Sequence, residues 1–161
     1  MGDLPNYLRN LETTKTMPTK YQTDVVAWAH EQAGLIRAGR FELLDLENIA
    51  EEIEDVGKSE QRELASRMAV LLAHLLKWQY QPQKRTSSWT LTIKEQRRLV
   101  IRRIQKTLSL RIVLEDTEWV DDIWLDSKTL AEKQTGLDIG IFPEICPWNL
   151  PNVLEESWLP D

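Results

Sequence analysis

The positions of proline restrict the fold of this 161-residue chain more than any other feature of its sequence. No proline lies between Pro18 and Pro82, and none lies between Pro82 and Pro143. Because proline inside a helix removes a backbone hydrogen bond and clashes with the preceding turn, these long intervals favour uninterrupted helices. The chain has only six glycines, so it has few of the turn signals that separate the strands of a sheet. The predicted fold class is therefore all-α.

The first proline-free interval carries apolar residues at helical spacing. They recur mostly three or four positions apart, which is the pattern of one buried helix face. They are Leu46, Ile49, Ile53, Val56, Leu64, Met68, Leu71, Leu75 and Trp78. The pattern slips near Gly57, so either one bent helix of about 35 residues or two shorter helices would account for it. We favour one continuous helix, which begins after an N-cap at Asp45 and ends before Pro82.

Three further helices are predicted to surround this central helix. They span about 21–38, 88–108 and 109–135. Gly39 and Gly136 follow the first and the last of them, as is common at helix ends. Ser87 or Ser88 is the expected cap of the second helix, and Ser109 opens the third.

Prolines concentrate again after Phe142 and predict an extended C-terminal segment, with a short helical stretch after Asn149. The predicted architecture is thus a helical bundle around one long central helix, with an extended C-terminal segment. Residues 1–19 are predicted to be a loosely ordered leader. Residues 20–161 are predicted to form a single helical domain, since their number suits one hydrophobic core.

Charge is distributed in blocks, although the net charge of the chain is only −6. Residues 45–63 hold eight acidic and two basic side chains, and residues 112–138 hold the same numbers. Between them, residues 81–111 hold nine basic side chains and one acidic side chain, a net charge of +8. This basic block either pairs with the acidic helices inside the bundle or forms a docking face for an acidic partner.

Several classes of protein are disfavoured by composition. Cys146 is the only cysteine, so no intrachain disulfide or cysteine-based zinc site is possible, and a buried inert thiol is expected. A membrane helix needs about 20 apolar residues, whereas the longest apolar run, from Met68 to Leu76, is interrupted by His74. The first residues do not have the pattern of a signal peptide. We therefore expect a cytoplasmic protein without membrane contact.

Several short motifs occur in an order that resembles a bacterial family, the domain of unknown function numbered 29. They include Tyr21-Gln22-Thr23-Asp24, Leu35-Ile36-Arg37-Ala38-Gly39, the acidic stretch 45–54, His74-Leu75-Leu76-Lys77-Trp78 and Phe142-Pro143-Glu144. The resemblance spans about residues 21–158. It implies a helical fold and a bacterial origin, and it implies no activity because the family has none assigned.

Three carboxylates, Glu47, Glu51 and Glu54, lie on one flank of the predicted central helix. Such spacing suits a divalent cation if a second helix adds a histidine or an aspartate. His74 reaches them only if the helix folds back at Gly57, because 20 residues of straight helix span about 30 Å. We therefore expect no metal and no other cofactor. The alternative is an acidic helix start that suits the helix dipole and faces the basic helix.

Arg67 and His74 share one face of the central helix. Their spacing resembles the motif of the HEPN ribonucleases, in which the histidine takes the 2′-hydroxyl proton and the arginine steadies the phosphate. Such a match arises easily by chance, and Met68 follows the arginine where that superfamily usually has a polar residue. We favour a histidine at the edge of the core, bonded to a backbone or carboxylate group.

Two groups of cations are distinguished on the predicted helix 88–108. Its outer face carries Lys94, Arg98, Arg102 and Lys106, which suit either a nucleic acid or an acidic protein surface. Arg97 instead lies within the apolar stripe, where a guanidinium cannot lose its charge and must find acceptors. We predict a bidentate structural ion pair between Arg97 and Glu54, or failing that Glu51 or Glu47. If Arg97 lined an open pocket instead, it would be an anion-binding residue.

Taken together, these patterns favour a non-enzymatic cytoplasmic interaction or regulatory protein. Its expected partner is another protein or a second copy of the chain. A nucleic-acid-directed enzyme of the HEPN ribonuclease type, which would use Arg67 and His74, is the alternative. A divalent-metal carboxylate site is less favoured.

Overall fold

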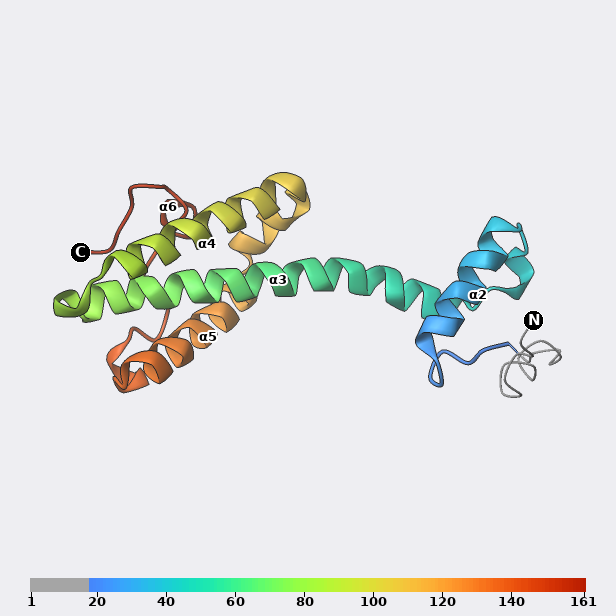
Figure 1. The fold of residues 1–161 in the computed structure, drawn as a ribbon, viewed down its shortest axis with the longest axis horizontal. Helices are drawn as coiled ribbons and strands as arrows, with labels where there is room; N and C mark the ends of the chain where they lie inside the picture. Colours follow the sequence, from blue (N-terminus) through green and yellow to red (C-terminus); the bar gives the residue numbers. More distant parts are fainter. Residues whose placement is uncertain (1–17) are drawn as a thin grey trace, which may run out of the picture. The chain divides into compact units, whose positions relative to one another are not determined.

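The computed structural model describes residues 18–161, and these form only helices and connecting turns, with no strand (Figure 1). The prediction of an all-α fold around one long central helix is confirmed. Helix α3 spans Leu46–Tyr80, so the stretch around Gly57 is helical rather than a junction of two helices. At its start, the Asp45 side chain accepts a hydrogen bond from the Asn48 amide at 3.4 Å. The chain then turns through the short 3-10 helix η2, Pro82–Lys84.

The chain divides into two compact units, Met1–Asp55 and Val56–Asp161. The described part of the first unit contains α2 (Val25–Arg37), the 3-10 helix η1 (Phe41–Leu43) and the first turns of α3. Trp28 is 3% exposed, and its indole nitrogen donates to the Asp45 carboxylate at 3.1 Å. The Asp45 amide in turn donates to the side-chain oxygen of Gln32 at 2.9 Å. These bonds tie α2 to the start of α3.

The second unit holds the main hydrophobic core. Its elements after α3 and η2 are α4 (Ser87–Lys106), η3 (Leu108–Glu115), α5 (Thr117–Thr135), η4 (Ile139–Ile141) and α6 (Leu150–Val153). Helices α4 and α5 flank the later part of α3 (Figure 1), and α3 contributes eight buried residues between Leu64 and Leu76. Val100, Trp124 and Val153 complete this core from α4, α5 and α6. The segment that is apolar nearly all round is therefore the covered part of the central helix.

The apolar stripe of α3 is not buried along its whole length, contrary to its interpretation as one buried face. Leu46 is 66% exposed and Ile53 is 67% exposed, whereas Leu64 and Leu75 are fully buried. The helical period therefore predicted the element correctly but not its burial. Periodicity reports which residues share a face, and a second element must still cover that face.

Some helix boundaries also differ from the predicted ones. Thr86, rather than Ser87 or Ser88, caps α4 by accepting a hydrogen bond from the Trp89 amide at 3.3 Å. The chain from Leu108 to Glu115 is 3-10 helix, and α5 begins only after Asp116, whose carboxylate accepts from the Trp119 amide at 3.1 Å. Both caps have extended backbone angles, which is why each ends the preceding segment and starts a new helix.

The predicted leader lies mostly outside the described residues. The prediction that residues 20–161 form one domain stays a prediction.

Substitution of Gly57 by alanine tests the continuity of α3. No heavy atom lies within 4 Å of the position that a Cβ would occupy, so the expected effect is the helix propensity alone. We expect Gly57→Ala to raise the free energy of unfolding by about 1 kcal/mol in urea titrations followed by circular dichroism. Gly136→Ala is the contrasting control, because Gly136 has a φ of 73° and a side chain is strained there. It is expected to cost about 1–2 kcal/mol. Destabilisation by Gly57→Ala would contradict a continuous helix.

Candidate functional site

Helix α4 separates an inner apolar face from an outer basic face. Its buried residues are Ile93, Arg97, Val100 and Ile104, at spacings of three and four. The predicted basic face, Lys94, Arg98, Arg102 and Lys106, is exposed along the other side. Arg98 pairs with Glu95 at 2.8 Å, one helical turn away. The other three cations form no ion pair within residues 18–161.

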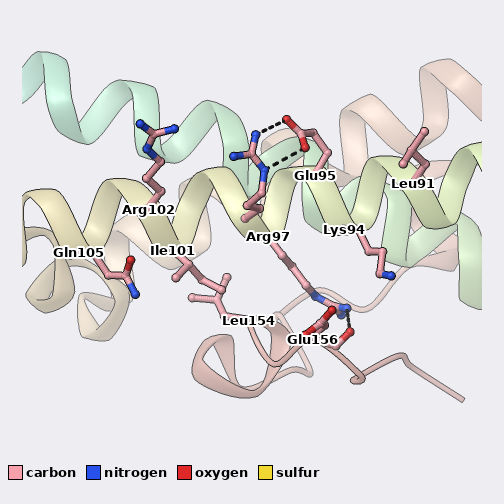
Figure 2. Close-up of a pocket in the computed structure, with 10 residues that line it drawn as sticks. Leu91, Lys94, Glu95, Arg97, Ile101, Arg102, Gln105, Leu154 and Glu156 are labelled. Carbon is pink, nitrogen blue, oxygen red and sulfur yellow. Dashed lines mark hydrogen bonds and ion pairs between the residues drawn. The ribbon is translucent and has the colours of Figure 1, made fainter.

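A groove of about 580 Å³ lies between α4 and the C-terminal segment (Figure 2). Its apolar residues are Leu91, Ile101 and Leu154, and its cationic residues include Lys94, Arg98 and Arg102. Figure 2 shows Ile101 of α4 and Leu154 of the C-terminal segment side by side. Leu91 is 70% exposed. The lining of the groove therefore combines apolar side chains with a majority of cations over carboxylates.

Arg97 anchors the C-terminal segment that forms one wall of this groove. Its Nε donates to the Val153 carbonyl at 2.8 Å and its Nη1 to the Glu156 carbonyl at 2.9 Å. Its Nη2 donates to the carbonyl of Trp158. The side chain is buried, and burial lowers the pKa of the Arg97 guanidinium, whereas the nearby Glu156 carboxylate raises it. Three carbonyl oxygens thus solvate a charge that cannot be removed by deprotonation.

The predicted partner of Arg97 is therefore corrected. The acceptors are backbone carbonyls of the C-terminal segment, where we had predicted the carboxylates of Glu54, Glu51 or Glu47. The antiparallel register of α3 and α4 gives the physical reason. Arg103 pairs with Glu60 at 2.6 Å, and this places residues near 66, rather than those near 54, opposite Arg97. Arg97 joins α4 to the chain end, and Arg103 joins α4 to α3.

Arg67 and His74 have different surroundings in the second unit. Arg67 pairs with Glu63 at 2.6 Å and lines a second groove together with Arg102 and Arg103. His74 is not among the residues that line that groove. Its Nδ1 lies 2.9 Å from the carbonyl oxygen of Val70, one turn earlier on α3. This contact is the kind of backbone hydrogen bond expected for a histidine at the edge of the core. Arg67 and His74 do not line the same groove.

The electrostatics of His74 agree with a partly buried neutral ring. Desolvation lowers the pKa of His74 below its ordinary value, the Val70 carbonyl raises it, and the charge of Lys77 lowers it further. Lys77 itself is held in place, because its ammonium group donates to Gln134 at 3.0 Å and lies 4.7 Å from the centre of the Trp89 ring.

The acidic flank of α3 does not form a metal centre in the described part of the chain. Within residues 18–161, no three histidine, cysteine, aspartate or glutamate side chains lie close enough together to hold an ion. Glu47 and Glu51 are exposed. Their neighbour Glu52 accepts a hydrogen bond from the Tyr21 hydroxyl at 2.6 Å, which raises the pKa of Tyr21 to about 12.

Cys146 is half-buried beside the Trp148 carbonyl. Burial raises the pKa of its thiol, so the thiolate is disfavoured.

Comparison with known proteins adds a family. Residues 20–159 match the family described as Domain of unknown function DUF29. The chain belongs to this family. The resemblance inferred from the order of the motifs is thereby confirmed, and the family description assigns no activity. No curated protein and no solved structure matches the chain. Within residues 18–161, no helix has both the length and the hydropathy that a bilayer crossing requires.

Sequence reasoning missed the part of the groove that the C-terminal segment supplies. Leu154 and Glu156 were not singled out, because a short helix after Asn149 carries no signal for where it docks. The position of Arg97 within an apolar stripe was the only clue. It indicated a buried guanidinium that needs acceptors, but it did not indicate which segment provides them.

Replacement of Arg97 tests its role as the anchor of the C-terminal segment. Arg97→Met leaves three carbonyls without their donor, and hydrogen bonds to a charged group are each worth about 1.5–3 kcal/mol. We expect a loss of at least about 3 kcal/mol in the free energy of unfolding, with faster amide exchange over residues 150–158. Arg97→Lys keeps the charge but not the three-way fork, so an intermediate loss is expected. Arg98→Met is the exposed control, and an equal effect in that variant would contradict the assigned role.

The lowered pKa of His74 predicts a pH dependence of stability. Between the folded pKa and the ordinary value of 6.5, the unfolded chain binds more protons than the folded chain. Stability from this group is therefore complete above pH 6.5 and is lost as the pH falls towards the folded pKa. We expect the free energy of unfolding of His74→Gln to fall less steeply than that of the wild type from about pH 7 to pH 5. His30→Gln controls for the loss of an imidazole, and identical curves for wild type and His74→Gln would contradict the prediction.

Proposed function

We propose that this protein is a non-enzymatic interaction protein that binds an acidic, apolar segment of another polypeptide in the α4 groove. The observation that supports it is the combination of Leu91, Ile101 and Leu154 with cations that have no ion pair within the described residues. Apolar contacts supply affinity at an interface, whereas charged groups at the rim mainly set selectivity and association rate. A segment with carboxylates beside large apolar side chains matches both features.

The composition of the groove favours a polypeptide over a nucleic acid. Glu95 and Glu156 lie among its lining residues, and they would oppose a phosphate on every nucleotide more than the few carboxylates of a mainly apolar segment. Arg98 is already neutralised by Glu95. No aromatic side chain lines the groove, so stacking on bases is not provided. Two of the tryptophans near the chain end are engaged with each other, since the rings of Trp148 and Trp158 lie 5.7 Å apart.

The same composition favours binding over catalysis. The residues that line the groove include no histidine, cysteine or serine. The groove therefore lacks the nucleophile and the paired base that covalent catalysis needs. The candidate pair for RNA cleavage lies elsewhere, and Arg67 and His74 are each bonded to neighbours on their own helix. In this proposal the groove acts by binding its partner. Any regulatory role depends on which partner is bound, and the lining residues carry out no reaction.

A fluorescence anisotropy titration tests this proposal. The probe is a fluorescein-labelled helical peptide of leucine and glutamate, with leucines at spacings of three and four. We expect binding that weakens with salt and that falls about tenfold or more in Lys94→Glu/Arg102→Glu and in Ile101→Asp. Lys84→Glu/Lys133→Glu changes the charge equally at exposed positions outside the groove and should bind like the wild type. Equal binding by all four chains would overturn the proposal.

A single-stranded RNA probe in the same assay tests the alternative. RNA binding tighter than peptide binding would replace the polypeptide with a nucleic acid as the occupant of the groove. RNA cleavage that disappears in both Arg67→Ala and His74→Ala, with the helical content unchanged, would establish the enzyme.

A further inference from the structure

A second groove, of about 340 Å³, is formed by α3 and α4 within the second unit. Its four cations are Arg67 of α3 and Arg102, Arg103 and Lys106 of α4. Glu60 is the carboxylate among its lining residues, and Glu63 pairs with two of the arginines. The cluster thus holds four positive and two negative side chains, a net charge of +2. This charge makes the second groove a candidate site for an anion.

Two of the arginines are held in place by carboxylates and still have free donors. Arg103 donates through Nη1 to Glu60 at 2.6 Å, and its Nη2 lies 3.7 Å from Glu63. Arg67 pairs through Nη2 with the same Glu63 oxygen at 2.6 Å. Each guanidinium has five N–H donors, and these pairs use only some of them. The carboxylates therefore orient both guanidinium groups beside the groove, which reduces the entropy lost when an anion binds.

The other two cations of the second groove have no carboxylate partner. Arg102 and Lys106 are exposed and form no ion pair within residues 18–161. Thr107 also lines the groove, and its hydroxyl forms no hydrogen bond in the same part of the chain. Lys106 lies in the last turn of α4, where a cation also suits the helix dipole. Arg102 precedes that turn, so the dipole does not account for it.

The charge and the donors of the second groove suit a phosphate monoester. A phosphorylated side chain carries about 1.5–2 negative charges at neutral pH and presents three acceptor oxygens. A phosphodiester of a nucleic acid carries one charge. The planar fork of arginine binds two phosphate oxygens at once. No aromatic residue is among those that line the groove, so stacking on a base is not provided.

Arg102 connects this groove to the α4 groove, because it lines both. Figure 2 shows its side chain pointing to the side of α4 opposite Leu154. A helix with its side chains is about 10–12 Å across, and an extended chain covers about 3.3–3.6 Å per residue. A ligand that crosses α4 beside Arg102 therefore needs about three residues to pass from one groove to the other.

We infer that the second groove binds a phosphorylated side chain of the segment held in the α4 groove. The inference rests on the proposed function and adds a modification to its partner. Arg67 and Arg103 provide oriented guanidinium donors, and Arg102 and Lys106 provide the charge that no carboxylate compensates. Thr107 adds a hydroxyl donor. Phosphorylation of the partner then strengthens its binding and makes the interaction regulated.

Inorganic phosphate tests the second groove by itself. Amide and arginine Nε–H resonances of the full-length protein are followed by NMR while sodium phosphate replaces sodium chloride at constant ionic strength. We expect saturable shifts of the residues that line the second groove, and binding about tenfold or more weaker in Arg102→Gln/Lys106→Gln. Lys84→Gln/Lys133→Gln removes equal charge at exposed positions outside both grooves and should bind like the wild type. An absence of saturable shifts, or equal binding by both variants, would overturn the inference.

Phosphopeptides test the connection between the two grooves. The probes are the leucine and glutamate peptide with a phosphoserine about three residues before its first leucine or about three residues after its last. In fluorescence anisotropy we expect one of them to bind about tenfold or more tightly than the same peptide with serine or glutamate at that position. Lys106→Gln/Thr107→Val, which changes the second groove only, should remove most of this gain.

Two results with these probes would overturn the inference. One is a phosphoserine that adds no more affinity than a glutamate at either position. The other is a single-stranded RNA that shifts the resonances of the second groove at a lower concentration than the phosphopeptides, since the groove would then serve a phosphodiester.

The failure of this inference is distinguishable from the failure of the proposed function. A chain that binds the unphosphorylated peptide and gains nothing from phosphoserine overturns the phosphate site and leaves the α4 groove as a docking site. A chain that binds inorganic phosphate in the second groove but none of the peptides overturns the proposed function, and with it the bound segment as the carrier of the phosphate.

Discussion

The bonding of Arg97 to three backbone carbonyls is the interaction on which the candidate site depends. Within residues 18–161 it is the polar connection between the C-terminal segment and the buried side of α4, and together with the buried Leu150 and Val153 it positions the wall that carries Leu154. The geometry also explains why arginine is required. A planar guanidinium presents donors in three directions at fixed angles, so one side chain binds the carbonyls of Val153, Glu156 and Trp158 together. The acceptors themselves are neutral, and the nearby Glu156 carboxylate is the group whose charge opposes that of Arg97.

The two faces of α4 differ in what they contact. On the inner side, Val100 and Ile104 pack on α3 and its neighbours, and the Arg103 pair with Glu60 fixes the register of the two helices. On the outer side, Lys94, Arg102 and Lys106 contribute charge without intrachain ion pairs in the described residues. Exposed ion pairs add little stability, so pairing these cations inside the chain would have gained less than about 1 kcal/mol each. In the proposed function, these cations set the selectivity and the association rate of the groove.

The helices could be predicted from the sequence, but several of the contacts between them could not. Helix α3 followed from apolar spacing and from the absence of proline, both of which are local properties. The partner of Arg97 did not follow, because any residue can offer a carbonyl and the acceptors lie more than fifty positions away. The exposure of Leu46 and Ile53 did not follow either, since a helical period shows that residues share a face and does not show whether anything covers it. The groove could be recognised only once α6 and its flanking residues had been placed beside α4.

The structure shows which residues of the acidic block 45–63 contact the basic helix α4 and which do not. Arg103 of α4 contacts the acidic block 45–63, with Glu60 at 2.6 Å and Glu63 at 3.7 Å. Those contacts lie in the second half of the acidic block, and Glu47 and Glu51 in its first half take no part in them. A block whose only function was to hold α3 against α4 would need its charges where the two helices touch. The acidic block therefore has two parts, since Glu60 and Glu63 contact α4 through Arg103, whereas Glu47 and Glu51 are exposed at the start of α3.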